Sequence, residues 1–123
     1  MLYTTQLTVQ PSTLVTNPSS VTIPMTLGKI NQITVMFPPG CCALVGVWLE
    51  HHTVKVLPWS MNEFLIGAGA TMTFPMNYGI DTEPYTVILY AYNNDDVYPH
   101  TVYVTINLSD ETPIEPVAVF AEL

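Results

Sequence analysis

The feature that most constrains the fold is an alternation of apolar and polar residues that recurs along most of the chain. Between residues 32 and 37, Ile33, Val35 and Phe37 alternate with Gln32 and Thr34. A period of two places successive side chains on opposite faces of a strand, so each such run predicts a half-buried strand. Similar runs cover residues 6–10, 21–27, 71–74, 85–92 and 101–108. No stretch of useful length has the 3.6-residue period of a helix, so we predict an all-β chain.

Turn residues separate these runs. Pro38-Pro39-Gly40 ends one strand, and Asn93 to Asp96 predict a hairpin loop between the last two strands. The run from Cys42 to Leu49 is apolar on both faces except at Gly46, which predicts a central strand covered on both sides. Residues 52–56 either pair back on that strand or continue it.

Two local signals refine this interpretation. Pro24 lacks a backbone donor, which places its strand at a sheet edge or at a bulge. In the least regular stretch, Trp59 to Gly69, Ser60 and Glu63 have the spacing of a capping box and predict a short helical turn.

These signals together predict a single antiparallel β-sandwich of jelly-roll or immunoglobulin-like type, with about eight strands. The sandwich domain covers residues 1–109. Residues 110–123 form a Pro-rich acidic linker and an apolar C-terminal arm, in which Val117, Val119 and Phe120 are candidate interface residues. The arm adds a strand either to its own sheet or to a neighbour, with the Pro24 strand as a candidate acceptor.

Charge excludes several partners. Lys29 and Lys55 are the only basic side chains, and the formal net charge is −8. Nucleic acid and anionic membranes attract basic proteins, so we expect neither as a partner. No stretch approaches the roughly 18 consecutive apolar residues of a membrane-spanning helix.

Residue types that form catalytic or metal sites in other proteins are present, but they lack the spacing that such sites require. His51 and His52 are adjacent, so a strand would direct them to opposite faces and away from a shared metal ion. Asp95 and Asp96 lie outside any calcium-loop pattern. No nucleophile motif is present. We therefore expect no enzymatic activity, no cofactor and no metal site.

Aromatic residues are the strongest candidates for an interaction site. Tyr90, Tyr92 and Tyr103 alternate with the predicted core residues of the last two strands, Tyr98 lies between these strands, and Trp48 lies on the second face of a central strand. Tyrosine and tryptophan are enriched at interfaces, so these side chains predict an interface patch. The alternatives are burial under another part of the same fold and a platform for sugar stacking.

Three runs carry a resemblance: Phe37 to Cys41, Leu44 to Val47, and Ala91 to Val102. They resemble turn and strand motifs of small all-β proteins found among viral and environmental sequences. The resemblance covers residues 37–104 and implies a virion structural protein without catalytic residues.

The function that we expect is a non-enzymatic structural subunit of a large symmetric assembly, as a capsid decoration, penton or spike protein on the outer surface of a virion. Its partners would be other copies of itself and other particle proteins. The alternative is a carbohydrate-binding or adhesive module, extracellular or at a cell surface, that binds glycans.

Overall fold

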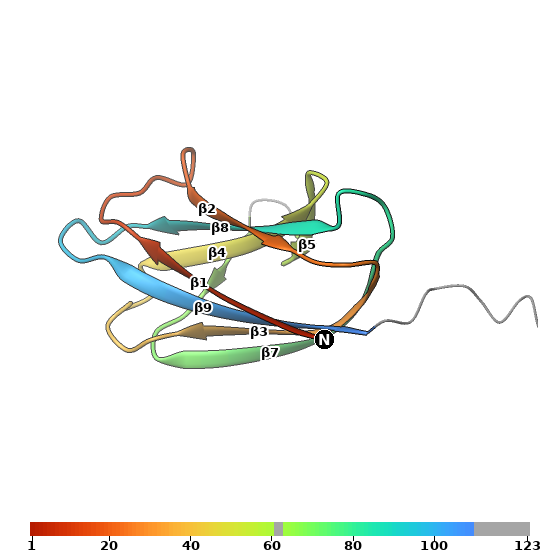
Figure 1. Cartoon of the computed structure of the whole chain (residues 1–123). Helices are drawn as coiled ribbons and strands as arrows, with labels where there is room; N and C mark the ends of the chain where they lie inside the picture. Colours follow the sequence, from red (N-terminus) through yellow and green to blue (C-terminus); the bar gives the residue numbers. More distant parts are fainter. Residues whose placement is uncertain (61–62, 110–123) are drawn as a thin grey trace, which may run out of the picture.

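The computed structural model describes residues 1–60 and 63–109 and consists of two antiparallel sheets packed face to face (Figure 1). The described residues contain no helix, so the predicted β-sandwich is confirmed. The first sheet has the order β1 (Leu2–Val9), β9 (His100–Ser109), β3 (Gly28–Phe37), β7 (Ala70–Ile80). The second has the order β2 (Ser19–Pro24), β8 (Thr86–Asn93), β4 (Val45–His51), β5 (Val54–Leu57), with β6 (Leu65–Ile66) also paired to β4.

The core lies between the two sheets, where the alternation places it. Ile33, Val35 and Phe37 of β3 have no exposed surface, and neither have Val87 and Leu89 of β8. Each β-branched or large apolar side chain buried in this way stabilises the fold by about 1.5–3 kcal/mol. The period-2 pattern therefore identified the inward faces of these strands correctly. The strand predicted over residues 21–27 instead ends at Pro24, and Leu27 is 40% exposed.

Proline marks sheet edges in this fold. Pro24 lies in β2 and Pro75 in β7, and both strands are edges of their sheets. A proline in a central strand would remove a hydrogen bond from the ladder, whereas an edge strand has one unpaired side. The prediction that Pro24 marks an edge is confirmed.

The predicted hairpin between the last two strands is wrong. β8 pairs with β2 and β4, whereas β9 pairs with β1 and β3. The loop between Asn93 and His100 thus crosses from one sheet to the other. A turn sequence fixes where a strand ends, but the partner of the next strand is chosen by packing.

The strand predicted over Cys42–Leu49 starts later than expected. Cys42 and Ala43 have φ angles of 50° and 60°, and the Leu44 amide donates to the Cys41 carbonyl at 2.8 Å, so these residues form a turn before β4. Of the two alternatives for residues 52–56, β5 pairs back on β4. The predicted helical turn at Ser60 lies partly, and the C-terminal arm entirely, outside the described residues.

Candidate functional site

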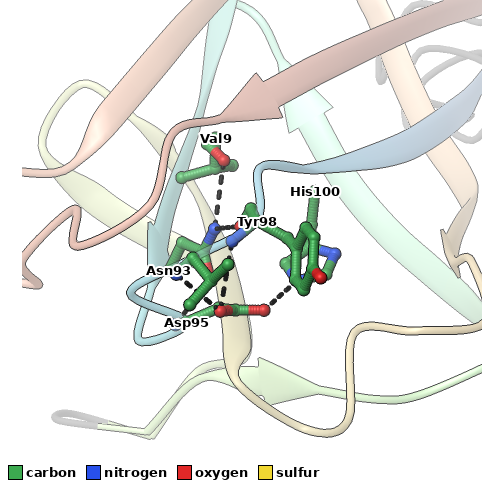
Figure 2. Close-up of polar contacts among 6 residues, drawn as sticks. Val9, Asn93, Asp95, Tyr98 and His100 are labelled. Carbon is green, nitrogen blue, oxygen red and sulfur yellow. Dashed lines mark hydrogen bonds and ion pairs between the residues drawn. The ribbon is translucent and has the colours of Figure 1, made fainter.

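A polar network fixes the loop that joins the two sheets at one end of the sandwich (Figure 2). Asn93, at the end of β8, is fully buried. Its side-chain nitrogen donates to the Val9 carbonyl at 3.1 Å and to the Tyr98 carbonyl at 3.0 Å, and its side-chain oxygen accepts from the Asp95 amide at 2.9 Å. One amide side chain therefore ties β1 to both ends of the loop.

Asp95 completes the network. One carboxylate oxygen accepts hydrogen bonds from the amides of Val97 at 2.9 Å and Tyr98 at 3.2 Å, and the other lies 2.9 Å from His100 Nε2. The backbone hydrogen bond from Val97, followed by the contact with His100, lowers the pKa of Asp95 below its ordinary value. Both carboxylate oxygens already have partners within the loop, so the geometry favours a structural role over cation binding.

A second loop is bound to the first. The Ser12 amide donates to the Asp95 carbonyl at 2.9 Å, and the Asn93 amide donates to the Thr13 carbonyl at 3.0 Å. We call these two segments, residues 10–18 and 94–99, the loop tip; both lie at the left in Figure 1. The loop tip exposes Leu14, Val15, Val97 and Tyr98, of which Val97 is 66% and Tyr98 64% exposed.

An aromatic cluster covers the outer face of the second sheet. The Trp48 ring stacks on Tyr90 with centroids 5.3 Å apart and packs against Phe64 at 5.0 Å, and Phe64 meets Tyr92 edge-on at 5.3 Å. Trp48 and Tyr92 are each only 8% exposed. The sequence indicated Trp48, Tyr90 and Tyr92 but missed Phe64, which lies in an irregular segment with no periodic signal.

The five aromatic residues singled out from the sequence do not form one patch. Tyr103 lies on the outer face of the first sheet because β8 and β9 belong to different sheets. Tyr98 lies in the loop tip. The arm residues Val117, Val119 and Phe120 are outside the described part of the chain.

The prediction that His51 and His52 point to opposite faces of a strand is wrong. β4 ends at His51, and His52 has a φ angle of 52°, so the chain turns and the two ring centroids lie 4.1 Å apart. His51 Nδ1 is 2.9 Å from the Tyr78 hydroxyl, and burial, reinforced by His52, lowers the pKa of His51. Residues 1–60 and 63–109 contain no cluster of three or more metal-binding side chains.

A pocket of about 410 Å³ lies beside the aromatic cluster, where Glu50, His52 and Tyr90 are among its lining residues. Trp48 Nε1 donates to Glu50 Oε2 at 2.9 Å and so holds that carboxylate against the sheet. Glu50 contributes a carboxylate to this pocket and His52 an imidazole, both beside the ring of Tyr90.

The outer face of the first sheet is polar but almost free of charge. The register aligns Thr4, Thr105, Thr34 and Thr73 in one row across all four strands. Lys29, at one end, is the only Asp, Glu, Lys or Arg in these strands. We call this surface the threonine face. Its outward residues are Leu2, Thr4, Gln6 and Thr8 of β1, Thr101, Tyr103, Thr105 and Asn107 of β9, Gln32, Thr34 and Met36 of β3, and Thr71, Thr73, Pro75 and Asn77 of β7.

Comparisons with known proteins add no family to this description. No protein-family model matches the chain, and a search of curated proteins found no similar sequence. Among the described residues there is no helix long and apolar enough to cross a membrane.

Proposed function

We propose that this protein is a non-enzymatic structural subunit that repeats in a large symmetric assembly. The observation that carries the proposal is the loop tip, where two loops from different parts of the chain are bound together and present exposed apolar side chains. Contiguous exposed apolar surface on a soluble domain is typical of a protein-binding site. Tyrosine is also among the residues enriched at interfaces.

The rigidity of the loop tip supports this role. Loops that order on binding lose conformational entropy, which weakens the complex. Here the hydrogen bonds of Asn93 and Asp95 fix the backbone around Val97 and Tyr98 before any partner arrives. A preorganised loop retains more of the free energy gained by burying its apolar side chains.

The charge of the chain supports a place on the outer surface of a particle, and we propose a virion as that particle. A net charge of −8 repels packaged nucleic acid, so an inner position facing a genome is unfavourable. An acidic exterior also keeps particles apart in solution.

The test is the mass and shape of the protein in solution, by multi-angle light scattering and negative-stain electron microscopy. We expect the wild type to form large regular species as the concentration rises. Val97→Asp should abolish them, because it places a charge in the centre of the loop-tip contact. Val54→Asp is the matched control. Val54 is also an exposed valine, 49% exposed, but it lies in β5 opposite His51, at the end of β4 that is far from the loop tip. A wild type that remains monomeric at every concentration would contradict the proposal.

A second function has one observation in its favour. The pocket beside Tyr90 combines an aromatic edge with Glu50 and His52, a combination that suits a sugar ring. The burial of Trp48 under Phe64 removes the larger ring from this platform. Glycan-array binding by a stable monomer, lost in Tyr90→Ala, would favour a carbohydrate-binding module over a structural subunit.

A further inference from the structure

We infer that the threonine face is a self-association surface, on which two copies of this chain pack sheet against sheet about a two-fold axis. The inference rests on the proposed function and names one of its contacts. It is carried by four observations: the distribution of charge, the exposed tyrosine and methionine of the face, its hydroxyl groups and its area.

Electrostatic repulsion limits which surfaces of two copies can come into contact. Each chain carries a formal net charge of −8, so contact between acidic surfaces is repulsive. Glu50 lies on the second sheet, about 10 Å behind the first sheet. The first sheets of two paired copies would also lie about 10 Å apart. Since the Debye length is about 8 Å at physiological ionic strength, Glu50 of two paired copies would be separated by more than two Debye lengths.

Within residues 1–60 and 63–109, the remaining acids near the first sheet are at its ends. Asp81 follows β7, whereas Asp95 precedes β9 at the opposite end, where its carboxylate is engaged with His100. Both positions are at the rim of the face, where Asp81 is exposed to solvent and Asp95 is paired with His100, so neither charge costs much. As far as the described residues are concerned, the threonine face is therefore the surface through which two copies can approach with the least repulsion.

Toward one end of the face, where β3 ends and β7 begins, two side chains of interface type lie side by side. Tyr103 and Met36 are cross-strand neighbours, 37% and 38% exposed, and are flanked by Gln6 and Thr71 in the same row. Tyrosine and methionine are enriched, and charged residues depleted, in protein interfaces. Tyr103 and Met36 also line a hollow of about 310 Å³ with Pro38 and Pro39, which can receive a side chain from the facing copy.

The hydroxyl groups make the face complementary to itself. A threonine hydroxyl both donates and accepts, so a row of threonines can pair with the same row of a second copy without an unmatched polar group. Cross-strand contacts already orient some of these groups: Thr34 and Thr73 hydroxyls are 3.3 Å apart, and those of Thr8 and Thr101 are 2.9 Å apart. Each keeps capacity for a further hydrogen bond.

The area of the face is sufficient for a specific pair. Four strands about 4.8 Å apart, over about eight residues of about 3.3 Å each, project roughly 500 Å². A pair of copies then covers roughly 1,000 Å² in total, the lower bound for a biological interface. Stacking of the two sheets would produce a four-layered dimer.

The experiment separates this face from the loop tip. In the Val97→Asp background, where large species should be lost, sedimentation velocity should still detect dimers. Adding Thr105→Glu should weaken dimerisation at least tenfold, because two glutamates would face each other across the two-fold axis. Gln6→Glu is a second, nearly isosteric variant at an exposed position opposite Tyr103, and should have the same effect. Thr22→Glu, at an exposed threonine of β2 on the other sheet, is the matched control and should leave the dimer unchanged.

The possible outcomes distinguish the two proposals. Dimers that dissociate with Thr105→Glu or Gln6→Glu but persist with Thr22→Glu, and that strengthen when added salt screens the net charge, support the inference. If the Val97→Asp protein is monomeric, or if both face variants still dimerise, the threonine face is not the contact and the proposed function stands. If the wild type is monomeric at every concentration, both proposals are overturned.

Discussion

At the scale of single residues, a few buried polar groups hold the loops of this sandwich. Asn93 is fully buried and makes three side-chain hydrogen bonds, while its neighbour Asn94 is exposed and contributes its backbone amide to the Leu44 carbonyl. Two adjacent asparagines with the same intrinsic preferences therefore have different roles.

Asn93→Ala should lower the free energy of unfolding by about 2–3 kcal/mol, because the buried Val9 carbonyl loses its donor and the loop loses two further bonds. The corresponding fall in melting temperature is about 10 °C for a domain of this size. Urea unfolding followed by circular dichroism measures the change. Asn94→Ala is the control and should change stability by less than about 0.5 kcal/mol. Equal effects of the two substitutions would contradict the role assigned to Asn93.

The lowered pKa of His51 predicts how the free energy of unfolding depends on pH. Burial and His52 lower its pKa below the ordinary value of 6.5, so the unfolded chain binds a proton more readily than the folded one. The stability due to the neutral ring is therefore present above about pH 6.5 and lost as the pH falls below that value. Urea unfolding at pH 7.5 and 5.5 should show a smaller loss on acidification for His51→Gln than for the wild type. Asp95, whose pKa is also lowered, adds a separate loss below its ordinary value of 3.8. An unchanged pH dependence in His51→Gln would contradict the assignment.

At the scale of elements, close packing on the outer face of the second sheet depends on one glycine. Gly46 in β4 lies opposite Tyr92 in β8, and a Cβ atom at Gly46 would approach the Tyr92 ring to less than the closest contact that packed atoms allow. The absent side chain leaves room for the Tyr92 ring beside Gly46, and Phe64 packs against that ring edge-on.

Gly46→Ala should therefore displace the Tyr92 ring and loosen the aromatic cluster, at a cost of about 1–3 kcal/mol. Gly79→Ala is the matched control, since Gly79 is also a strand glycine and its added Cβ would come no closer than 4.0 Å to another atom, Asp81 Oδ2. Denaturant unfolding gives the stability of each variant, and the fluorescence of Trp48 reports on the cluster. A Gly46→Ala protein as stable as Gly79→Ala would show that the ring moves without cost.

At the scale of the whole molecule, the described residues bury an apolar core between two paired sheets. β9, the last described strand, is hydrogen-bonded on both sides by β1 and β3, and Val102, Val104 and Ile106 are fully buried. Removal of residues 112–123 should therefore leave the sandwich folded, with a free energy of unfolding within about 0.5 kcal/mol of the full chain.

Differential scanning calorimetry of the truncated and full chains measures this difference. A loss of several kcal/mol would place apolar residues of the arm, such as Val119 and Phe120, against the core, since each such side chain contributes about 1.5–3 kcal/mol when buried. Comparison of assembly by the two chains then tests whether the arm contacts a neighbour.

The sequence by itself determined most of the strands, most of their inward faces and one sheet edge. Alternation is a local property, because successive side chains of a strand must face opposite ways, so Ile33, Val35 and Phe37 were assigned to the core without knowledge of their partners. Pro24 marked an edge for an equally local reason, since it lacks a backbone donor.

Only the tertiary structure decided which strands are neighbours. The assignment of β8 and β9 to different sheets separated Tyr90 and Tyr92 from Tyr103, and left Tyr98 in the loop tip. The same assignment aligned Thr4, Thr105, Thr34 and Thr73, which are far apart in the sequence, in one row. Strand pairing depends on burying the apolar faces of the whole chain at once, and no local pattern encodes that choice.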